Sequence, residues 1–187
     1  MAQDLAASVR ARLLNIAKAE QTDFNAVLVR YALERFLYRL SQSAHADRFV
    51  LKGAMLFNLW YAMPHRPTRD VDLLGFGASD LGAIAQAFRE IVSVAADDGM
   101  VFDAASVSVE EIRKSAGYAG ARVWVSAELA RARTQARVIG FSIDRLDDIR
   151  AAGLELAHFS KRAVHHHITM AGVFHPRRIR HGFEEAA

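Results

Sequence analysis

Two aspartates separated by one residue offer the clearest chemistry in this 187-residue sequence. Asp70 and Asp72 lie in RDVDLLG (69–75), which alternates polar and apolar residues and is predicted to be a β-strand. Side chains two positions apart in a strand point to the same side, about 6.5–7 Å apart, so both carboxylates would face one point. They would repel each other unless a hard cation were bound between them. The pair predicts a Mg²⁺ site, in which the ion can polarise an attacking hydroxyl and neutralise charge on a transferred phosphorus.

The residues ahead of this strand strengthen a signal that is weak alone, because many half-exposed strands carry Asp-x-Asp on their solvent side. An apolar run at 49–51 ends in Lys52 and Gly53, and the next segment, 54–63, has helical character. A glycine turn that opens a helix presents backbone amides and the positive end of the helix dipole to phosphate. Lys52 and Arg69 add positive charge. Together these residues predict a phosphate-binding turn beside the metal site.

The elements that must position these residues show two different hydrophobic periods. Helical spacing marks 4–20 and 23–43, with Asp23 as the N-cap of the second helix, and 79–96, with Ser79 as the N-cap. The later segments SVSVEEI, ARVWVSAEL and TQARVIGFSI alternate and are rich in valine, which is typical of strands. The chain is therefore predicted to form one α+β domain built on a mixed sheet with helices.

Composition excludes several classes of protein. The sequence contains no cysteine, which rules out a disulfide framework, a thiolate zinc site and a cysteine nucleophile, and which fits a reducing cytoplasm. No stretch approaches the roughly 20 apolar residues that span a bilayer, so we expect a soluble protein with no membrane partner. The net charge is +3, and its basic residues gather in the C-terminal third. That bias fits either a polyanion-binding surface or a solvated one.

The segment FVLKGAMLFNLWYAMPHRPTRDVDLLG (49–75) resembles the AbiEii/AbiGii toxin-type nucleotidyltransferases. The signature of that family is an apolar strand, a Lys-Gly-Gly-Thr-like turn, a helix and an Arg-x-Asp-x-Asp-like strand. The resemblance covers roughly residues 1–130 and implies a fold similar to the DNA polymerase β superfamily, that is, a nucleotidyltransferase-like mixed β-sheet with flanking helices. It implies a domain over 1–145 that includes an N-terminal helical pair (1–45), followed by a divergent or truncated segment, 146–187.

The resemblance also implies roles for individual residues. Asp70 and Asp72 match the catalytic carboxylates that bind Mg²⁺ with a nucleoside triphosphate. Lys52 and Gly53 match the nucleotide-binding turn, and Arg69 matches the basic position before the first aspartate. The implied function is transfer of a nucleotide to an acceptor such as tRNA or another RNA, by the toxin of a toxin–antitoxin pair whose antitoxin is a protein.

Two departures from the family pattern leave a second hypothesis open. The turn continues as Ala54 and Met55, so a hydroxyl that could contact phosphate is missing. The family's third carboxylate precedes a Gly-Phe-Gly-Asp-like sequence, but here Gly140-Phe141 follows RVI (137–139), which offers no metal ligand. Asp144 could substitute from another place. The alternative to an enzyme is therefore a non-catalytic remnant or binding module of the same fold.

Overall fold

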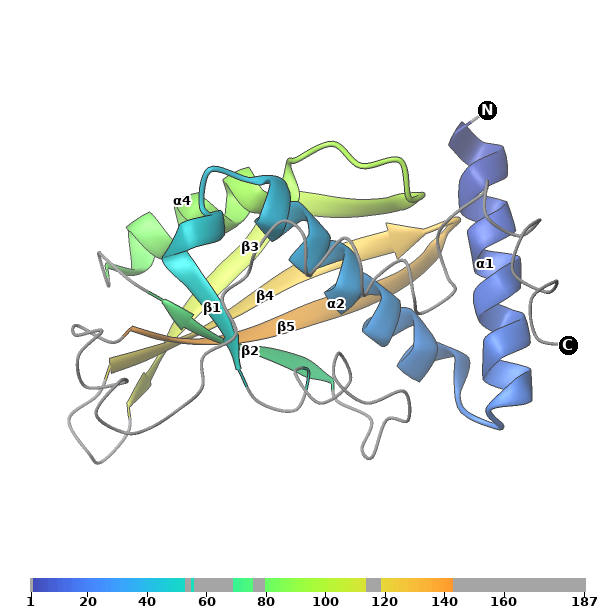
Figure 1. Ribbon diagram of the computed structural model, residues 1–187, viewed down its shortest axis with the longest axis horizontal. Helices are drawn as coiled ribbons and strands as arrows, with labels where there is room; N and C mark the ends of the chain where they lie inside the picture. Colours follow the sequence, from blue (N-terminus) through green and yellow to red (C-terminus); the bar gives the residue numbers. More distant parts are fainter. Residues whose placement is uncertain (1, 53–54, 56–68, 76–79, 114–118, 143–187) are drawn as a thin grey trace, which may run out of the picture.

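The computed structural model describes residues 2–52, 55, 69–75, 80–113 and 119–142 (Figure 1). Gly53, Ala54, Asp144 and the predicted C-terminal segment 146–187 lie outside these residues. The described elements follow one another along the chain as α1 (Ala2–Ala19), α2 (Phe24–Gln42), the 3₁₀ turn η1 (Ala46–Arg48), β1 (Phe49–Lys52), β2 (Asp70–Gly75), α4 (Leu81–Val92), β3 (Met100–Arg113), β4 (Ala119–Leu129) and β5 (Ala132–Ser142). The predicted α+β class is confirmed.

The described strands form one mixed sheet of five strands in the order β1-β2-β5-β4-β3. β2 and β5 run parallel, whereas β1 with β2, β5 with β4, and β4 with β3 are antiparallel. β4 and β5 are joined by a two-residue turn in which both Ala130 and Arg131 have positive φ, at 46° and 68°. Positive φ at both turn positions matches the right-handed twist of the flanking strands, which keeps this hairpin in register.

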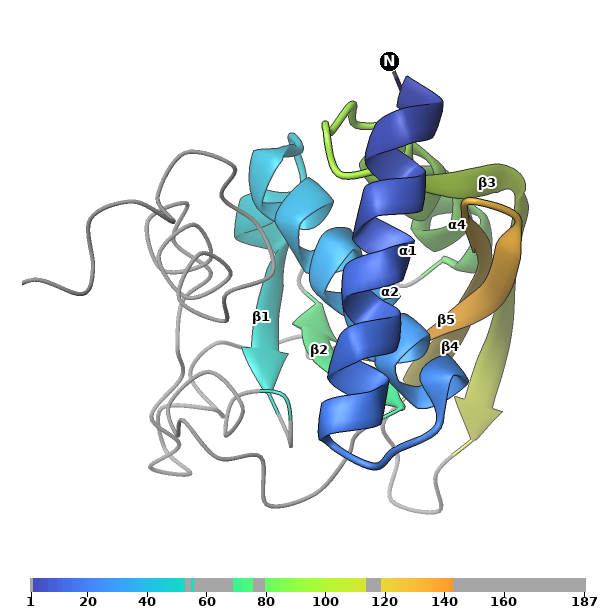
Figure 2. The same cartoon turned by 90° about the vertical axis from the view of Figure 1, so that its right-hand side faces the viewer.

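The helices begin where side chains can cap them. The Asp23 carboxylate accepts hydrogen bonds from the backbone amides of Asn25 and Ala26, as predicted for the start of α2. α4 is shorter than the predicted 79–96 at both ends. Its N-cap is Asp80, which accepts from the amide of Ala83, so the prediction of Ser79 as the cap is wrong. α2 lies across the sheet, and α1 packs beside it (Figures 1 and 2).

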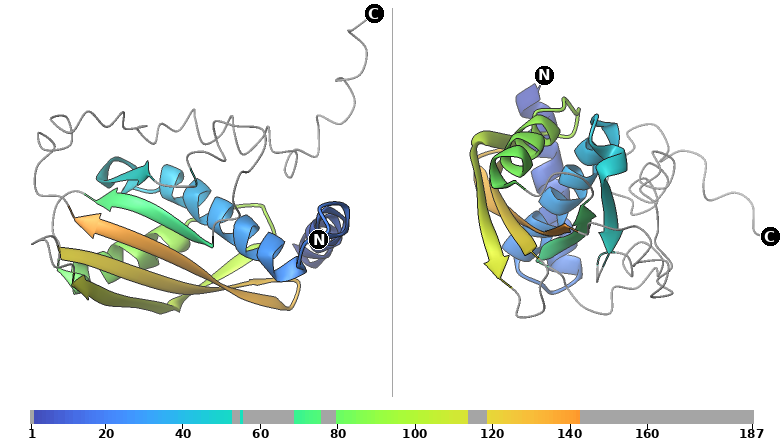
Figure 3. Two further views of the ribbon diagram at one scale, coloured as in Figure 1. Left: turned by 90° about the horizontal axis from the view of Figure 1, so that it is seen from below. Right: turned by 90° about the vertical axis from the view of Figure 1, so that its left-hand side faces the viewer.

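The core lies between the helices and one face of the sheet. Figure 3 shows α2 against the strands, with β1 at one side and β3 at the other. The Phe88 ring of α4 stacks on Phe36 of α2 and meets the edge of Phe49 of β1, with centroids 5.4 Å and 5.7 Å apart. Val71 and Val138, from the two parallel strands, are fully buried in the same cluster. Each such side chain contributes about 1.5–3 kcal/mol by leaving water.

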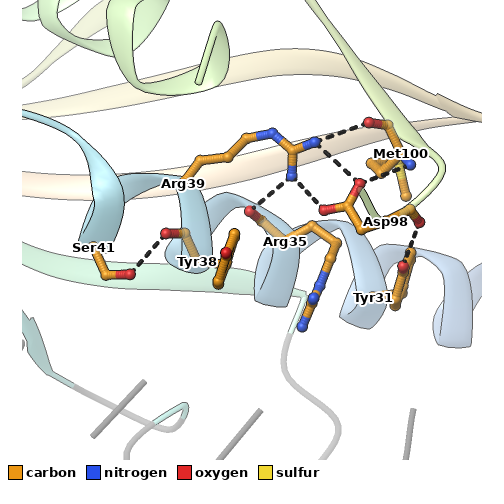
Figure 4. A network of polar contacts seen from close by, with 7 residues as sticks. All are labelled: Tyr31, Arg35, Tyr38, Arg39, Ser41, Asp98 and Met100. Atoms are coloured by element: carbon orange, nitrogen blue, oxygen red, sulfur yellow. Dashed lines mark hydrogen bonds and ion pairs between the residues drawn. The ribbon is translucent and has the colours of Figure 1, made fainter. Parts of the chain in front are cut away.

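A buried polar network joins α2 to the chain just before β3 (Figure 4). Arg39 donates to both carboxylate oxygens of Asp98, at 2.7 Å and 3.1 Å, and to the carbonyl oxygen of Met100 at 3.0 Å. The Tyr31 hydroxyl donates to the Asp98 carbonyl at 2.7 Å, and burial raises the pKa of Tyr31, which keeps it a neutral donor. Gly99 has φ of +72°, and a Cβ there would lie 2.8 Å from Ala6 Cα. This turn therefore fixes α1, α2 and β3 relative to one another.

We expect Asp98→Asn to lower the free energy of unfolding by about 3–5 kcal/mol, because it leaves the Arg39 charge buried without a counterion. Urea denaturation measures the change. The matched control is Glu128→Gln, which breaks the exposed Arg133–Glu128 pair (3.2 Å) and should cost no more than about 1 kcal/mol. Equal losses for the two variants would contradict a structural role for the buried pair.

Glu34, the carboxylate of α2, makes stability depend on pH. Burial raises the pKa of Glu34, and the neighbouring Arg35 and Arg30 offset part of that rise. A carboxyl whose pKa is higher in the folded state than in the unfolded state binds its proton more tightly when folded. The stability that it contributes is fully present below the unfolded pKa, and it is lost as the pH rises through the folded pKa.

Glu34→Gln should therefore leave stability unchanged at low pH and increase it at neutral pH, because glutamine is uncharged and has no carboxylate charge to desolvate. The measurement is the urea midpoint of both proteins across the range from below about pH 4, the ordinary range of a glutamate pKa, to pH 8. The low-pH points, where both side chains are neutral, serve as the internal control. A difference that stays constant across this range would show that burial does not disfavour the Glu34 charge.

Candidate functional site

Strand β2 presents both aspartates on the sheet face that points away from the helices. Val71 and Leu73 have no exposed area and belong to the core, whereas Asp70 and Asp72 are half-buried on the other side. The predicted alternation is therefore observed from Asp70 to Leu73, whereas Leu74, on the same side as the aspartates, is also buried. Two carboxylates lie on one face of one strand, and the core beneath holds them there.

Lys52 joins the aspartates through the pairing of β1 with β2. In this antiparallel register Lys52 lies directly opposite Asp72, and Leu51 lies opposite Leu73. Residues directly opposite each other in an antiparallel pair share a face, with Cβ atoms about 4.5–5.5 Å apart. The structure thus brings together three of the residues singled out in the sequence, namely Lys52, Asp70 and Asp72.

The other residues of the predicted phosphate-binding turn are described only in part. Arg69 is exposed and immediately precedes β2. Gly53 and Ala54 lie outside the described residues. Met55 is only 3% exposed and packs in the hydrophobic core. The position where the family carries a hydroxyl is therefore occupied by a side chain that contributes to folding.

Arg137 of β5 forms an ion pair with Asp70. The parallel register sets Arg137 beside Asp70 and Val138 beside Val71. The Arg137 Nη2 donates to Asp70 Oδ2 at 2.8 Å, and the two side chains are 43% and 26% exposed. The sequence indicated only that Arg137 cannot bind a metal. Its partnership with Asp70 depends on a strand pairing that joins residues 67 positions apart.

The same face continues onto β4 with an aromatic residue. Trp124 lies directly opposite Arg137, and the Arg122 guanidinium lies 5.7 Å from the centroid of the Trp124 ring. The sequence pattern of ARVWVSAEL predicted a strand but gave no role to Arg122 or Trp124. The alternation itself carried the signal, because Val123 and Val125 turn into the core and so leave Arg122 and Trp124 on the other side. We call the set Lys52, Asp70, Asp72, Arg122, Trp124 and Arg137 the polar sheet face.

The donor chemistry of the polar sheet face fits one hard cation. Mg²⁺ is commonly held by one or two carboxylates together with substrate phosphates, and Asp70 and Asp72 supply two. Within the described residues, no group of three or more His, Cys, Asp or Glu side chains could hold a metal. A third acid at Asp144 lies outside this part of the chain. Asp98, an aspartate that could otherwise be considered, is committed to Arg39.

No helix in the described part of the chain combines the length and the apolar character needed to cross a bilayer.

The chain matches a known protein family. The family model described as "Nucleotidyl transferase AbiEii toxin, Type IV TA system" matches residues 35–151, which include Lys52, Asp70, Asp72 and Arg137. No curated protein and no solved structure matches the chain.

Proposed function

Because the chain belongs to the AbiEii family of nucleotidyl transferase toxins, we propose that it transfers a nucleotide from a nucleoside triphosphate to an acceptor at the polar sheet face. The observation that carries this proposal is the pairing of β1 with β2. It sets Lys52 opposite Asp72 on the strand that also carries Asp70. A cation for phosphate and two oxygen ligands for a metal thus share one face.

Asp70 and Asp72 would hold Mg²⁺, which when bound would neutralise charge on the phosphates and favour attack by an acceptor hydroxyl. Lys52 would bind and orient the triphosphate, because an ammonium beside the carboxylates supplies a donor and a positive charge where phosphate oxygens would lie. Arg69, exposed at the start of β2, would add a second phosphate contact. Gly53, which matches the family's nucleotide-binding turn, would belong to the same phosphate-binding region.

The family's place in type IV toxin–antitoxin systems supports two further partners. The acceptor would be an RNA such as tRNA, and a protein antitoxin would oppose the toxin. Triphosphates and RNA are both cytoplasmic, and the absence of cysteine suits that reducing compartment. Trp124 and Arg122, next to the proposed site, offer an aromatic plane and a cation, the combination on which unpaired bases stack.

A second candidate function is nucleotide binding without transfer. The observation that favours it is the ion pair of Asp70 with Arg137, together with the absence of a group of three acids in the described residues. Such a protein would keep the fold and lose the chemistry. Binding and transfer must therefore be measured separately.

Asp72→Asn should reduce nucleotide transfer at least about 100-fold, because it removes charge from the site without changing the shape of the side chain. The purified protein is incubated with each of four α-labelled triphosphates, Mg²⁺ and total RNA, and labelled RNA is quantified on a gel. Asp103→Asn, a change to an exposed aspartate on β3, is the matched control and should leave labelling intact. Equal labelling by wild type and Asp72→Asn would sink the assignment of the site.

Calorimetry with triphosphate and Mg²⁺ separates the two candidate functions. The enzyme is supported if the triphosphate binds with micromolar affinity, if Asp72→Asn weakens that binding, and if nucleotide transfer is also observed. The same binding with no labelling of any acceptor supports the binding module.

A further inference from the structure

The ion pair between Asp70 and Arg137 contributes too little to folding to explain why an arginine is found at position 137. Pairs as exposed as this one, with side chains 26% and 43% accessible, contribute at most about 1 kcal/mol to folding. The Arg137 Nε is buried and, among the described residues, has no hydrogen-bond partner. An unsatisfied buried donor carries a cost. Folding alone therefore gives little reason for an arginine at this position.

The register shows where the guanidinium charge is held. Val71 and Val138 lie side by side in the core, so Asp70 and Arg137, one position earlier on each strand, lie side by side on the polar sheet face. On the other side of Arg137, Trp124 lies directly opposite on β4. Arg137 is thus set between a large aromatic residue and the aspartate, and its Nη2 reaches the Asp70 oxygen at 2.8 Å.

We infer that the Arg137 guanidinium is a permanent cation of the site. It binds the Asp70 carboxylate and competes there with a divalent ion. A guanidinium close to a bound divalent ion repels it, and solvent exposure reduces this repulsion without removing it. The Asp70 Oδ2 that accepts from Arg137 is also less available to a metal. The polar sheet face therefore binds a divalent ion more weakly than it would without the Arg137 charge.

Arg137, in register with Asp70, is a physical counterpart to the third carboxylate that the described residues do not supply at the site. A third acid next to Asp70 would add negative charge and call for a further cation, whereas the arginine in register with Asp70 supplies positive charge directly. Because a guanidinium is always protonated and matches phosphate geometry, Arg137 would also attract a triphosphate that carries its own metal. The inference rests on the proposed function for its biological meaning, but not for its test.

The test is binding of Mn²⁺ alone, without nucleotide, measured from the electron paramagnetic resonance signal of free Mn²⁺. Arg137→Gln, which removes the charge and keeps a polar side chain, should lower the apparent Kd for Mn²⁺ about tenfold relative to wild type. Arg137→Glu, which adds a third acid, should lower it further. Arg137→Lys keeps the positive charge and should bind Mn²⁺ as weakly as wild type. The double variant Asp70→Asn/Arg137→Gln should lose the gain in Mn²⁺ affinity that Arg137→Gln shows alone.

The matched control is Arg133→Gln, on the same strand, which breaks the exposed ion pair with Glu128 and should leave Mn²⁺ affinity within about twofold of wild type. Far-UV circular dichroism and the urea midpoint establish that each variant is folded. If Arg137→Gln and Arg137→Glu bind Mn²⁺ no more tightly than wild type, the inference is overturned. It is also overturned if Arg137→Lys gains as much affinity as Arg137→Gln, since charge would then not be the cause. Neither outcome depends on RNA labelling, so failure of the proposed activity is recognised separately.

Discussion

The parallel pairing of β2 with β5 is the constraint on which the candidate site depends. It joins the two short strands that carry Lys52, Asp70 and Asp72 to the long antiparallel strands. Because strand residues alternate between faces, the register that brings the core valines of β2 and β5 together also brings Asp70 beside Arg137. A slip of one residue would turn the charged side chains into the core. Hydrophobic packing thus fixes the charge pairing of the site.

The helices hold the sheet from the opposite side, so the site is built on a rigid support. α2 is tied to the start of β3 by the Arg39–Asp98 ion pair, and the Phe36 and Phe88 rings stack between α2 and α4. These contacts lie on the core side of the sheet, opposite the polar sheet face. Sites built on strands keep their geometry better than sites built on loops.

The balance of charge distinguishes this face from a purely acidic metal site. Lys52, Arg122 and Arg137 accompany Asp70 and Asp72, and Glu110 of β3 lies directly opposite Arg122, so the face mixes cations with carboxylates. Such a face attracts a triphosphate and its metal together, whereas a cluster of acids attracts the metal first. In this chain, membership of the nucleotidyl transferase family and the lack of a third acid among the described residues are therefore compatible.

The sequence by itself determined the α+β class, the Asp23 cap and the same-face placement of Asp70 and Asp72, because each follows from local periodicity or from a side chain that bonds its own backbone. It did not determine that Asp80 and not Ser79 caps the N-terminus of α4, because the two neighbouring polar residues compete for that role. Only the tertiary structure decided that Lys52 lies opposite Asp72 and that Arg137 binds Asp70. Those contacts depend on strand order and register, which are set by the packing of the whole core and leave no mark in the spacing of residues along the chain.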